Sequence, residues 1–205
     1  MKKVAIVNYD AGNLDSVARA VIECGGKPEI SCNPDTFARA DFIILPGVGS
    51  FARGMQKIRD RNLDVILREQ VIDCGIPFLG ICLGMQLLAT RGREGGETPG
   101  LGWIEGRVER FQPTGLDVRI PHVGWNEAIY QHSSPLLRNI PPRKDFYFVH
   151  SYHFLCDRAE DILAYTPYCG NFVSIVSRDN IFGVQFHPEK SQKVGLQLLR
   201  NFLAL

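Results

Sequence analysis

Apolar runs and amphipathic stretches alternate through the first part of the chain. Residues 4–7 and 42–45 are continuous apolar runs, which is the pattern of strands buried on both faces. Between them, apolar side chains recur at positions 14, 17, 18, 21 and 22, the spacing of one face of a helix. Asn13 could cap this helix and Gly25 could close it. The alternation predicts a parallel sheet with crossover helices.

The alternation of strand-like and helix-like stretches continues further along the chain and is then followed mainly by strand-like stretches. We expect a helix over residues 63–74 ended by Gly75, a strand over 77–81, and a helix that starts directly after Cys82. Strand-like stretches with turns follow at 107–111, 123–130, 146–155, 162–165 and 172–177. A last strand at 181–186 leads into a closing amphipathic helix. The prediction is an α/β fold with a mostly parallel central sheet, helices on both faces and an antiparallel extension. No linker or repeat divides residues 1–205, so we expect a single domain.

Composition narrows the possible partners. Lys and Arg number 23 against 22 Asp and Glu, so the formal net charge is +1 and no basic excess favours nucleic acid or anionic membranes. Met1-Lys2-Lys3 precedes only four apolar residues, and no segment approaches the roughly 20 needed to cross a bilayer. The protein is therefore expected in the cytoplasm. Its six cysteines are scattered without zinc-like spacing, so no metal or cofactor is expected.

The strongest chemical signal is Gly80-Ile81-Cys82-Leu83-Gly84, where an apolar strand meets a turn and then a helix. This is the nucleophile-elbow pattern with cysteine in the place of serine. Glycines two residues on either side allow the backbones to approach closely. Amide N–H groups and the positive dipole end at a helix start favour a thiolate. Cys82 is therefore a candidate nucleophile, although a lone cysteine is more often a small buried hydrophobe.

A thiol nucleophile needs a base and a group that orients the base. His187-Pro188-Glu189 follows another apolar strand. If Pro188 keeps the backbone extended, the side chains of His187 and Glu189 project to the same side. Glu189 could instead be a solvated acid in the first turn of the last helix. The order Cys, His, Glu argues against an α/β-hydrolase, in which the acid precedes the histidine.

Other residues give weaker signals. Gly47-Val48-Gly49 follows a strand and could complete an oxyanion hole with the Leu83 N–H, or it could be an ordinary glycine turn. His150 and His153 lack a third metal ligand and are interpreted as structural. His122 and His132 show no chemistry by spacing.

These motifs together resemble the class I, or triad, glutamine amidotransferases. Within that class the chain is similar to the glutaminase subunits of imidazole glycerol phosphate synthases. This narrower resemblance rests on further blocks that span nearly the whole chain, namely Asn8-Tyr9-Asp10-Ala11-Gly12-Asn13-Leu14, Pro46-Gly47-Val48-Gly49-Ser50-Phe51, Pro121-His122-Val123-Gly124-Trp125-Asn126, Tyr147-Phe148-Val149-His150-Ser151-Tyr152 and His187-Pro188-Glu189-Lys190-Ser191. Val123 stands where relatives commonly have Met, a substitution of tolerable volume.

The resemblance implies a flavodoxin-like core and a triad of Cys82, His187 and Glu189 that hydrolyses L-glutamine to glutamate and ammonia. The implied substrate and oxyanion residues are Gly47, Gly49, Leu83, Gln86, Glu94, Ser151 and Tyr152. The ammonia would pass to a separate (β/α)8-barrel synthase subunit in a heterodimer, which forms imidazole glycerol phosphate and an aminoimidazole carboxamide ribonucleotide in histidine biosynthesis. Asn13, Trp125 and Lys190 match positions at that interface.

Other functions stay open at this stage. A close paralogue would feed ammonia to a related synthase that makes surface-glycan sugars. A non-catalytic partner would keep the scaffold and regulate a synthase by binding. A stand-alone thiol hydrolase or peptidase would act without any partner.

Overall fold

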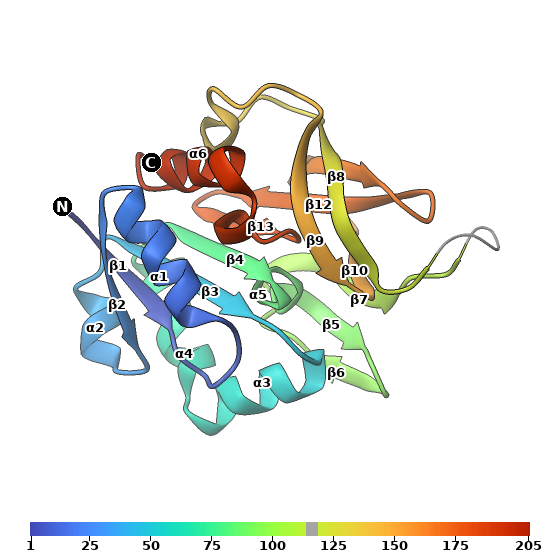
Figure 1. Cartoon of the computed structure of the whole chain (residues 1–205). Helices are drawn as coiled ribbons and strands as arrows, with labels where there is room; N and C mark the ends of the chain where they lie inside the picture. Colours follow the sequence, from blue (N-terminus) through green and yellow to red (C-terminus); the bar gives the residue numbers. More distant parts are fainter. Residues whose placement is uncertain (114–118) are drawn as a thin grey trace.

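The computed structural model describes residues 1–113 and 119–205. Its centre is a set of parallel strands in the order β2-β1-β3-β4-β13, which corresponds to the flavodoxin-like order 2-1-3-4-5. The strands are β1 Lys2–Val7, β2 Gly26–Ser31, β3 Phe42–Gly47, β4 Phe78–Cys82 and β13 Ile181–Val184. Their carboxyl ends therefore share one edge of the sheet (Figure 1).

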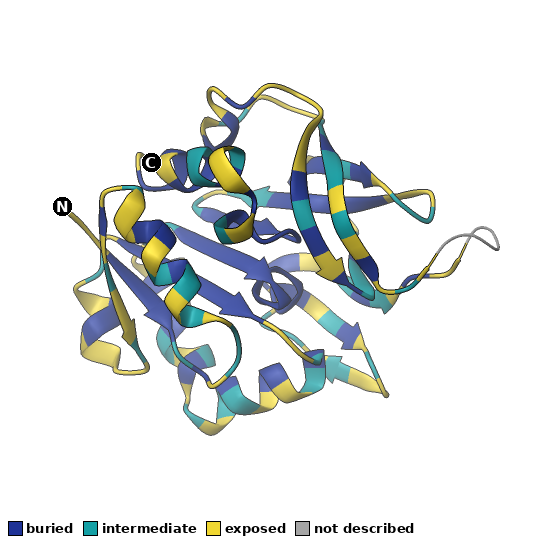
Figure 2. Cartoon of the chain, viewed as in Figure 1, coloured by how far each residue is buried: buried dark blue, intermediate teal, exposed yellow. Residues whose placement is uncertain are grey.

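Helices cover both faces of this sheet because successive strand residues point to opposite sides. Val4 and Ile6 of β1 pack with α1 (Leu14–Glu23) and α6 (Gln192–Phe202), whereas Ala5 and Val7 belong to the core on the other face. That second face is covered by α2 Pro34–Ala38, α3 Phe51–Asp60, α4 Leu63–Arg68 and α5 Leu83–Gln86. Figure 2 shows β3 and β4 as buried ribbon, whereas the edge strand β2 is largely exposed and the helices are exposed on their outer sides.

The sheet continues beyond β13 mainly in antiparallel fashion. The order runs through β12 Asn171–Arg178, β10 Tyr152–Cys156, β7 Ile104–Arg110, β5 Ala89–Arg93 and β6 Glu97–Pro99, with β5 and β7 parallel. β11 (Ile162–Pro167) pairs with β12 and links it to β8 (His122–Tyr130), which pairs with β9 (Lys144–His150). Short 3-10 turns occur at Pro135–Leu137, Ala159–Asp161 and Pro188–Lys190. The predicted α/β class with its antiparallel extension is thus confirmed.

Several local predictions need correction. The helix predicted over 63–74 is α-helical only to Arg68 and continues as a π-helical turn, η1, over Glu69–Asp73. The helix after Cys82 is a single turn, because the chain leaves it at Leu87 to form β5. The strand predicted over 146–155 is broken at Ser151, where the chain passes from β9 to β10.

No helix among the described residues is both long enough and apolar enough to cross a bilayer.

Candidate active site

Cys82 lies in a strained turn at the carboxyl end of β4. Its φ is +54° and its ψ is −109°, a backbone conformation that L-residues rarely adopt and that costs about 1–3 kcal/mol. Two close backbone approaches require glycine here: a Cβ on Gly80 would lie 2.6 Å from the carbonyl oxygen of Gly84, and a Cβ on Gly84 would lie 1.8 Å from that of Leu45. The sequence thus holds the thiol at the start of α5, where backbone N–H groups lack helical partners.

His187 reaches the same edge of the sheet from β13. Val184 pairs with Ile81 of the parallel strand β4, so the residues that follow β13 leave the sheet beside Cys82. His187 Nδ1 lies 2.8 Å from Glu189 Oε1, and the side chains of both residues are almost fully buried. This geometry leaves His187 Nε2, which has no other hydrogen-bond partner among the described residues, as the nitrogen available to the sulfur.

Charge around the imidazole favours its protonated form. Burial lowers the pKa of His187, but the interactions with the Cys82 sulfur and with the Glu189 carboxylate outweigh burial and raise the pKa to about 10. The imidazole is therefore well suited to accept the proton of the thiol and to donate it to a leaving group.

One expectation about this pair was wrong in its geometry. Pro188 does not keep the chain extended, because residues Pro188–Lys190 form a 3-10 turn. The turn is closed by the hydrogen bond from Lys190 N–H to the His187 carbonyl and is held by Ser191, whose hydroxyl donates to the same carbonyl at 2.7 Å. His187 and Glu189 therefore meet across a tight turn and not along an extended strand.

A cavity of about 260 Å³ opens beside Cys82. It is lined by residues of three segments, namely Val48, Gly49, Cys82, Leu83, Gln86, Val149, His150, Ser151 and Tyr152. Five of the predicted substrate and oxyanion residues are in this lining. Gly47 is buried behind it, as the register partner of Cys82 in the ladder between β3 and β4.

The predicted substrate residue Glu94 has a different position. It is half-buried and does not line the cavity. Its Oε2 accepts a hydrogen bond of 2.8 Å from the Phe51 N–H, at the first turn of α3. In the structure, Glu94 caps that helix.

The residues predicted at an interface are all exposed at the surface. Asn13 caps α1 by accepting a hydrogen bond from the Ser16 N–H. Trp125 is 47% exposed on β8, and the Lys190 ammonium lies 6.0 Å from the centre of the Tyr147 ring on β9. Trp125 and Tyr147 are register partners, so these two side chains share the outward face of the β8–β9 pair.

Two residues of the site were missed in the sequence. Gln185 is fully buried, accepts a hydrogen bond from Gln86 Nε2 at 2.9 Å, and directs its own Nε2 to the Cys82 sulfur at 3.7 Å. Tyr9 is also fully buried, and its hydroxyl lies where a Cβ on Gly47 would stand. Burial and the nearby Cys82 both raise the pKa of Tyr9. A glutamine inside an apolar run at a strand end was the signal available for Gln185.

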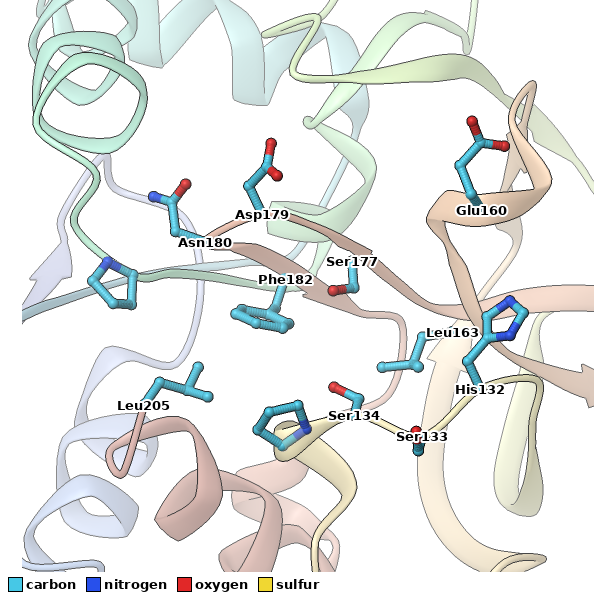
Figure 3. Close-up of a pocket in the computed structure, with 12 residues that line it drawn as sticks. His132, Ser133, Ser134, Glu160, Leu163, Ser177, Asp179, Asn180, Phe182 and Leu205 are labelled. Carbon is cyan, nitrogen blue, oxygen red and sulfur yellow. The ribbon is translucent and has the colours of Figure 1, made fainter.

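A larger cavity of about 530 Å³ lies at the opposite end of the central strands (Figure 3). It is bordered by Pro77 before β4 and by Phe182 in β13, and His132, Glu160 and Asp179 stand around its rim. None of the predicted site residues belongs to its lining.

The fold and the site together define an enzyme that uses a thiol for acyl transfer. The family model for class-I glutamine amidotransferases matches residues 5–205, and the chain belongs to this family. It is 46% identical over 202 residues to the imidazole glycerol phosphate synthase subunit HisH 1 of Campylobacter jejuni strain RM1221, covering 98% of this chain and 100% of the relative. It is 43% identical to the HisH subunit of Nitrosococcus oceani, covering 99% and 97%.

Solved structures agree with the fold. A glutamine amidotransferase crystal structure superposes with a TM-score of 0.73 at 19% identity, covering 98% of this chain and 97% of that one. The glutaminase domain of Trypanosoma brucei CTPS gives a TM-score of 0.69 at 18% identity, covering 100% and 92%.

Proposed function

We propose that this protein is the glutaminase subunit of an imidazole glycerol phosphate synthase, which hydrolyses glutamine and supplies the ammonia to a synthase subunit in histidine biosynthesis. The observation that carries the proposal is the position of Cys82, in a strained elbow between the buried His187–Glu189 pair and a substrate-sized cavity. The near full-length identity of 43–46% to subunits named HisH supports the pathway.

The chemistry follows from the positions of the three groups. The Cys82 sulfur attacks the carboxamide carbon of glutamine while His187 holds the thiol proton. His187 then delivers this proton to the nitrogen, ammonia departs, and a glutamyl thioester remains. Water, deprotonated by His187, attacks the thioester and releases glutamate. Glu189 orients the imidazole and balances its charge throughout.

Backbone N–H groups would stabilise the tetrahedral intermediates. Leu83 is the first residue of α5, so its N–H lacks an intrahelical partner. Gly49 borders the cavity with a φ of +105°, a conformation suited to turning an amide inwards. One such donor contributes about 3 kcal/mol to the transition state. Gln86, Ser151 and Tyr152 would hold the substrate from the other side.

The surface around the cavity fits a protein partner. Val48 and Val149 line the cavity and are 50% and 36% exposed. Val123, the register partner of Val149, and Trp125 on the same strand are 57% and 47% exposed. A patch of large apolar side chains of this kind marks an interaction site. We therefore expect a synthase subunit, a (β/α)8 barrel by resemblance, to bind over the cavity in a heterodimer and receive the ammonia without release to bulk water. A catalytic thiol of this kind is best preserved in the reducing cytoplasm.

Replacing the nucleophile tests the proposal. We expect Cys82→Ala to lower glutamine-dependent synthase activity of the reconstituted complex by on the order of 10⁴-fold. Activity with ammonium as nitrogen source should be unchanged, because the synthase subunit uses ammonia directly. Glutamine hydrolysis retained by Cys82→Ala would refute the assigned role of Cys82. Absence of hydrolysis by the unaltered protein with its partner would favour a regulatory subunit, and full activity without a partner would favour a stand-alone hydrolase.

A further inference from the structure

Two buried histidines that the proposed reaction does not use lie side by side next to the cavity. His122 begins β8 and His150 ends β9, and the two are register partners in the antiparallel ladder. They are only 4% and 7% exposed. His122 Nδ1 lies 3.1 Å from His150 Nε2, so the rings are joined by a hydrogen bond.

The Tyr152 carbonyl at one end of the histidine pair and the Asn126 amide at the other determine the direction of each hydrogen bond between them. His150 Nδ1 lies 2.8 Å from the Tyr152 carbonyl oxygen, which can only accept, so Nδ1 carries the proton. Its Nε2 therefore accepts from His122 Nδ1–H in the neutral pair, and His122 Nε2 accepts from Asn126 Nδ2 at 3.3 Å. The Asn126 amide has a fixed orientation because its Nδ2 also donates to the Pro167 carbonyl and its Oδ1 accepts from the Glu127 N–H.

Both rings are neutral near pH 7. Burial lowers the pKa of His122 to about 4. Burial and the neighbouring histidines lower the pKa of His150 to about 3, although its hydrogen bond to the Tyr152 carbonyl acts in the opposite direction. The His122 ring has apolar surroundings, since the ring centres of Phe148 and Tyr168 lie 5.0 and 3.9 Å from its own.

The chain of hydrogen bonds ends at groups of the candidate active site. The Tyr152 carbonyl accepts a second hydrogen bond, of 3.0 Å, from Gln86 Nε2. Gln86 also donates to Gln185, which contacts the Cys82 sulfur. Ser151, which separates β9 from β10, and Tyr152, the first residue of β10, both line the cavity. The Tyr152 carbonyl is held by two side chains, His150 and Gln86.

We propose that His122 and His150 are positioning residues. They hold the Tyr152 carbonyl, and through it Gln86, in the geometry in which Gln86 binds the carboxamide of the substrate. The inference rests on the proposed glutaminase function. It assigns these imidazoles a defined tautomer, with the proton on Nδ1 in both rings, and no direct part in the reaction. It also connects the cavity to Asn126, whose neighbour Trp125 points outwards from the same strand.

We expect the chain of hydrogen bonds from Asn126 through His122 and His150 to the Tyr152 carbonyl to affect the affinity for glutamine. In complexes with the synthase subunit, His150→Leu and His122→Leu are expected to raise the KM for glutamine about tenfold and to change kcat less than threefold. His150→Asn keeps a donor near the Nδ1 position and should return the KM to within about threefold of the unaltered value. The Kd for glutamine in the same variants, made in a Cys82→Ala background, should follow the KM.

His153→Leu is the matched control. His153 is also largely buried and stacks on Phe111 with ring centres 4.6 Å apart, but it makes no hydrogen bond to His122 or His150 among the described residues. Its replacement should leave the KM within about twofold. Ammonium-dependent activity should be unchanged in every variant, which verifies folding and assembly.

The tautomers provide a test that needs no turnover. Long-range ¹⁵N–¹H spectra of the unaltered protein should show the proton on Nδ1 in both rings. A proton on Nε2 of either ring would overturn the proposal, as would equal KM values for His150→Leu, His150→Asn and His153→Leu. If the unaltered complex neither binds nor hydrolyses glutamine, the proposed function fails and this inference fails with it.

Discussion

Among single residues, Cys82 and then Glu189 set the charge state of the site, because their interactions with His187 outweigh its burial and raise the pKa of His187 from 6.5 to about 10. A raised histidine pKa stabilises the folded state fully below pH 6.5 and loses this effect as the pH rises towards 10. We expect Glu189→Gln to lower the free energy of unfolding by about 2 kcal/mol at pH 6, with a smaller loss at pH 10. Urea unfolding at several pH values measures this.

The surface pair of Glu127 and Arg143 provides the control for that experiment. Its side chains are 26% and 66% exposed, and an exposed ion pair contributes at most about 1 kcal/mol. Glu127→Gln should therefore have a small effect that hardly varies from pH 6 to pH 10. A loss in Glu189→Gln that grows with pH would contradict the assigned charge state.

A second residue-scale prediction concerns the elbow. In Gly84→Ala the new methyl group would overlap the Leu45 carbonyl oxygen, at 1.8 Å, and β3 would have to move away from α5. We expect a loss of at least about 3 kcal/mol in unfolding free energy, measured by urea unfolding. Gly54→Ala is the control, since its Cβ meets only flexible leucine tips at 3.3–3.5 Å inside α3. Equal stability of the two variants would contradict the packing described for the elbow.

Among secondary-structure elements, sequence patterns predicted those that bury one regular face. The parallel core strands other than β2, together with α1 and α6, have continuous or periodic apolar residues and were predicted. β2 was missed because it is a polar edge strand with the sequence Gly-Lys-Pro-Glu-Ile-Ser. α3 was missed although Phe51, Met55 and Ile58 have helical spacing after the Ser50 cap, so its signal was present.

The elements of the site differ in how far they were predictable. The elbow at Cys82 depends on local glycines, so the sequence alone indicated it. The break at Ser151 and the turn at Pro188 depend on contacts with distant strands, for example the Phe111 N–H donating to the Ser151 carbonyl at 3.0 Å. Gln185 directly follows β13 and the His122–His150 pair lies at the ends of β8 and β9, and only the register of neighbouring strands shows what these residues contact.

The N-terminus of α3 provides a prediction at this scale, because Glu94 and Ser50 both accept hydrogen bonds from its first turn. Ser50→Ala should cost about 1 kcal/mol of unfolding free energy, and Glu94→Ala should cost a similar amount. If Glu94 also binds substrate, as the resemblance implies, Glu94→Ala should raise the KM for glutamine severalfold more than Ser50→Ala does. Steady-state kinetics of the two complexes measures the difference, and equal KM values would limit Glu94 to capping.

In the whole molecule, the β8–β9 pair separates two functions by the alternation of its side chains. The side chains of His122 and Asn126 point inwards and hydrogen-bond to each other, whereas those of Val123 and Trp125 point outwards to solvent. Both faces lie close to the cavity, because Val149 lines it from β9 and His150 follows directly. A partner that covers the outward face would therefore close the cavity without disturbing the core of the sheet.

This arrangement makes Trp125 the side chain most suited to anchor the synthase subunit. Aromatic anchors at the centre of an interface contribute 2 kcal/mol or more, so Trp125→Ala should raise the Kd for the partner about 30-fold. Its own unfolding free energy should hardly change, since the indole is 47% exposed. Val65→Ala removes an apolar side chain that is 65% exposed on α4, on the other face of the sheet, and should leave the Kd unchanged. Calorimetric titration of the synthase subunit measures both.

Because the partner closes the cavity in our proposal, the Trp125→Ala complex should regain full glutamine-dependent activity at saturating partner concentration. Weak activity at saturation would instead give Trp125 a part in arranging the active site itself.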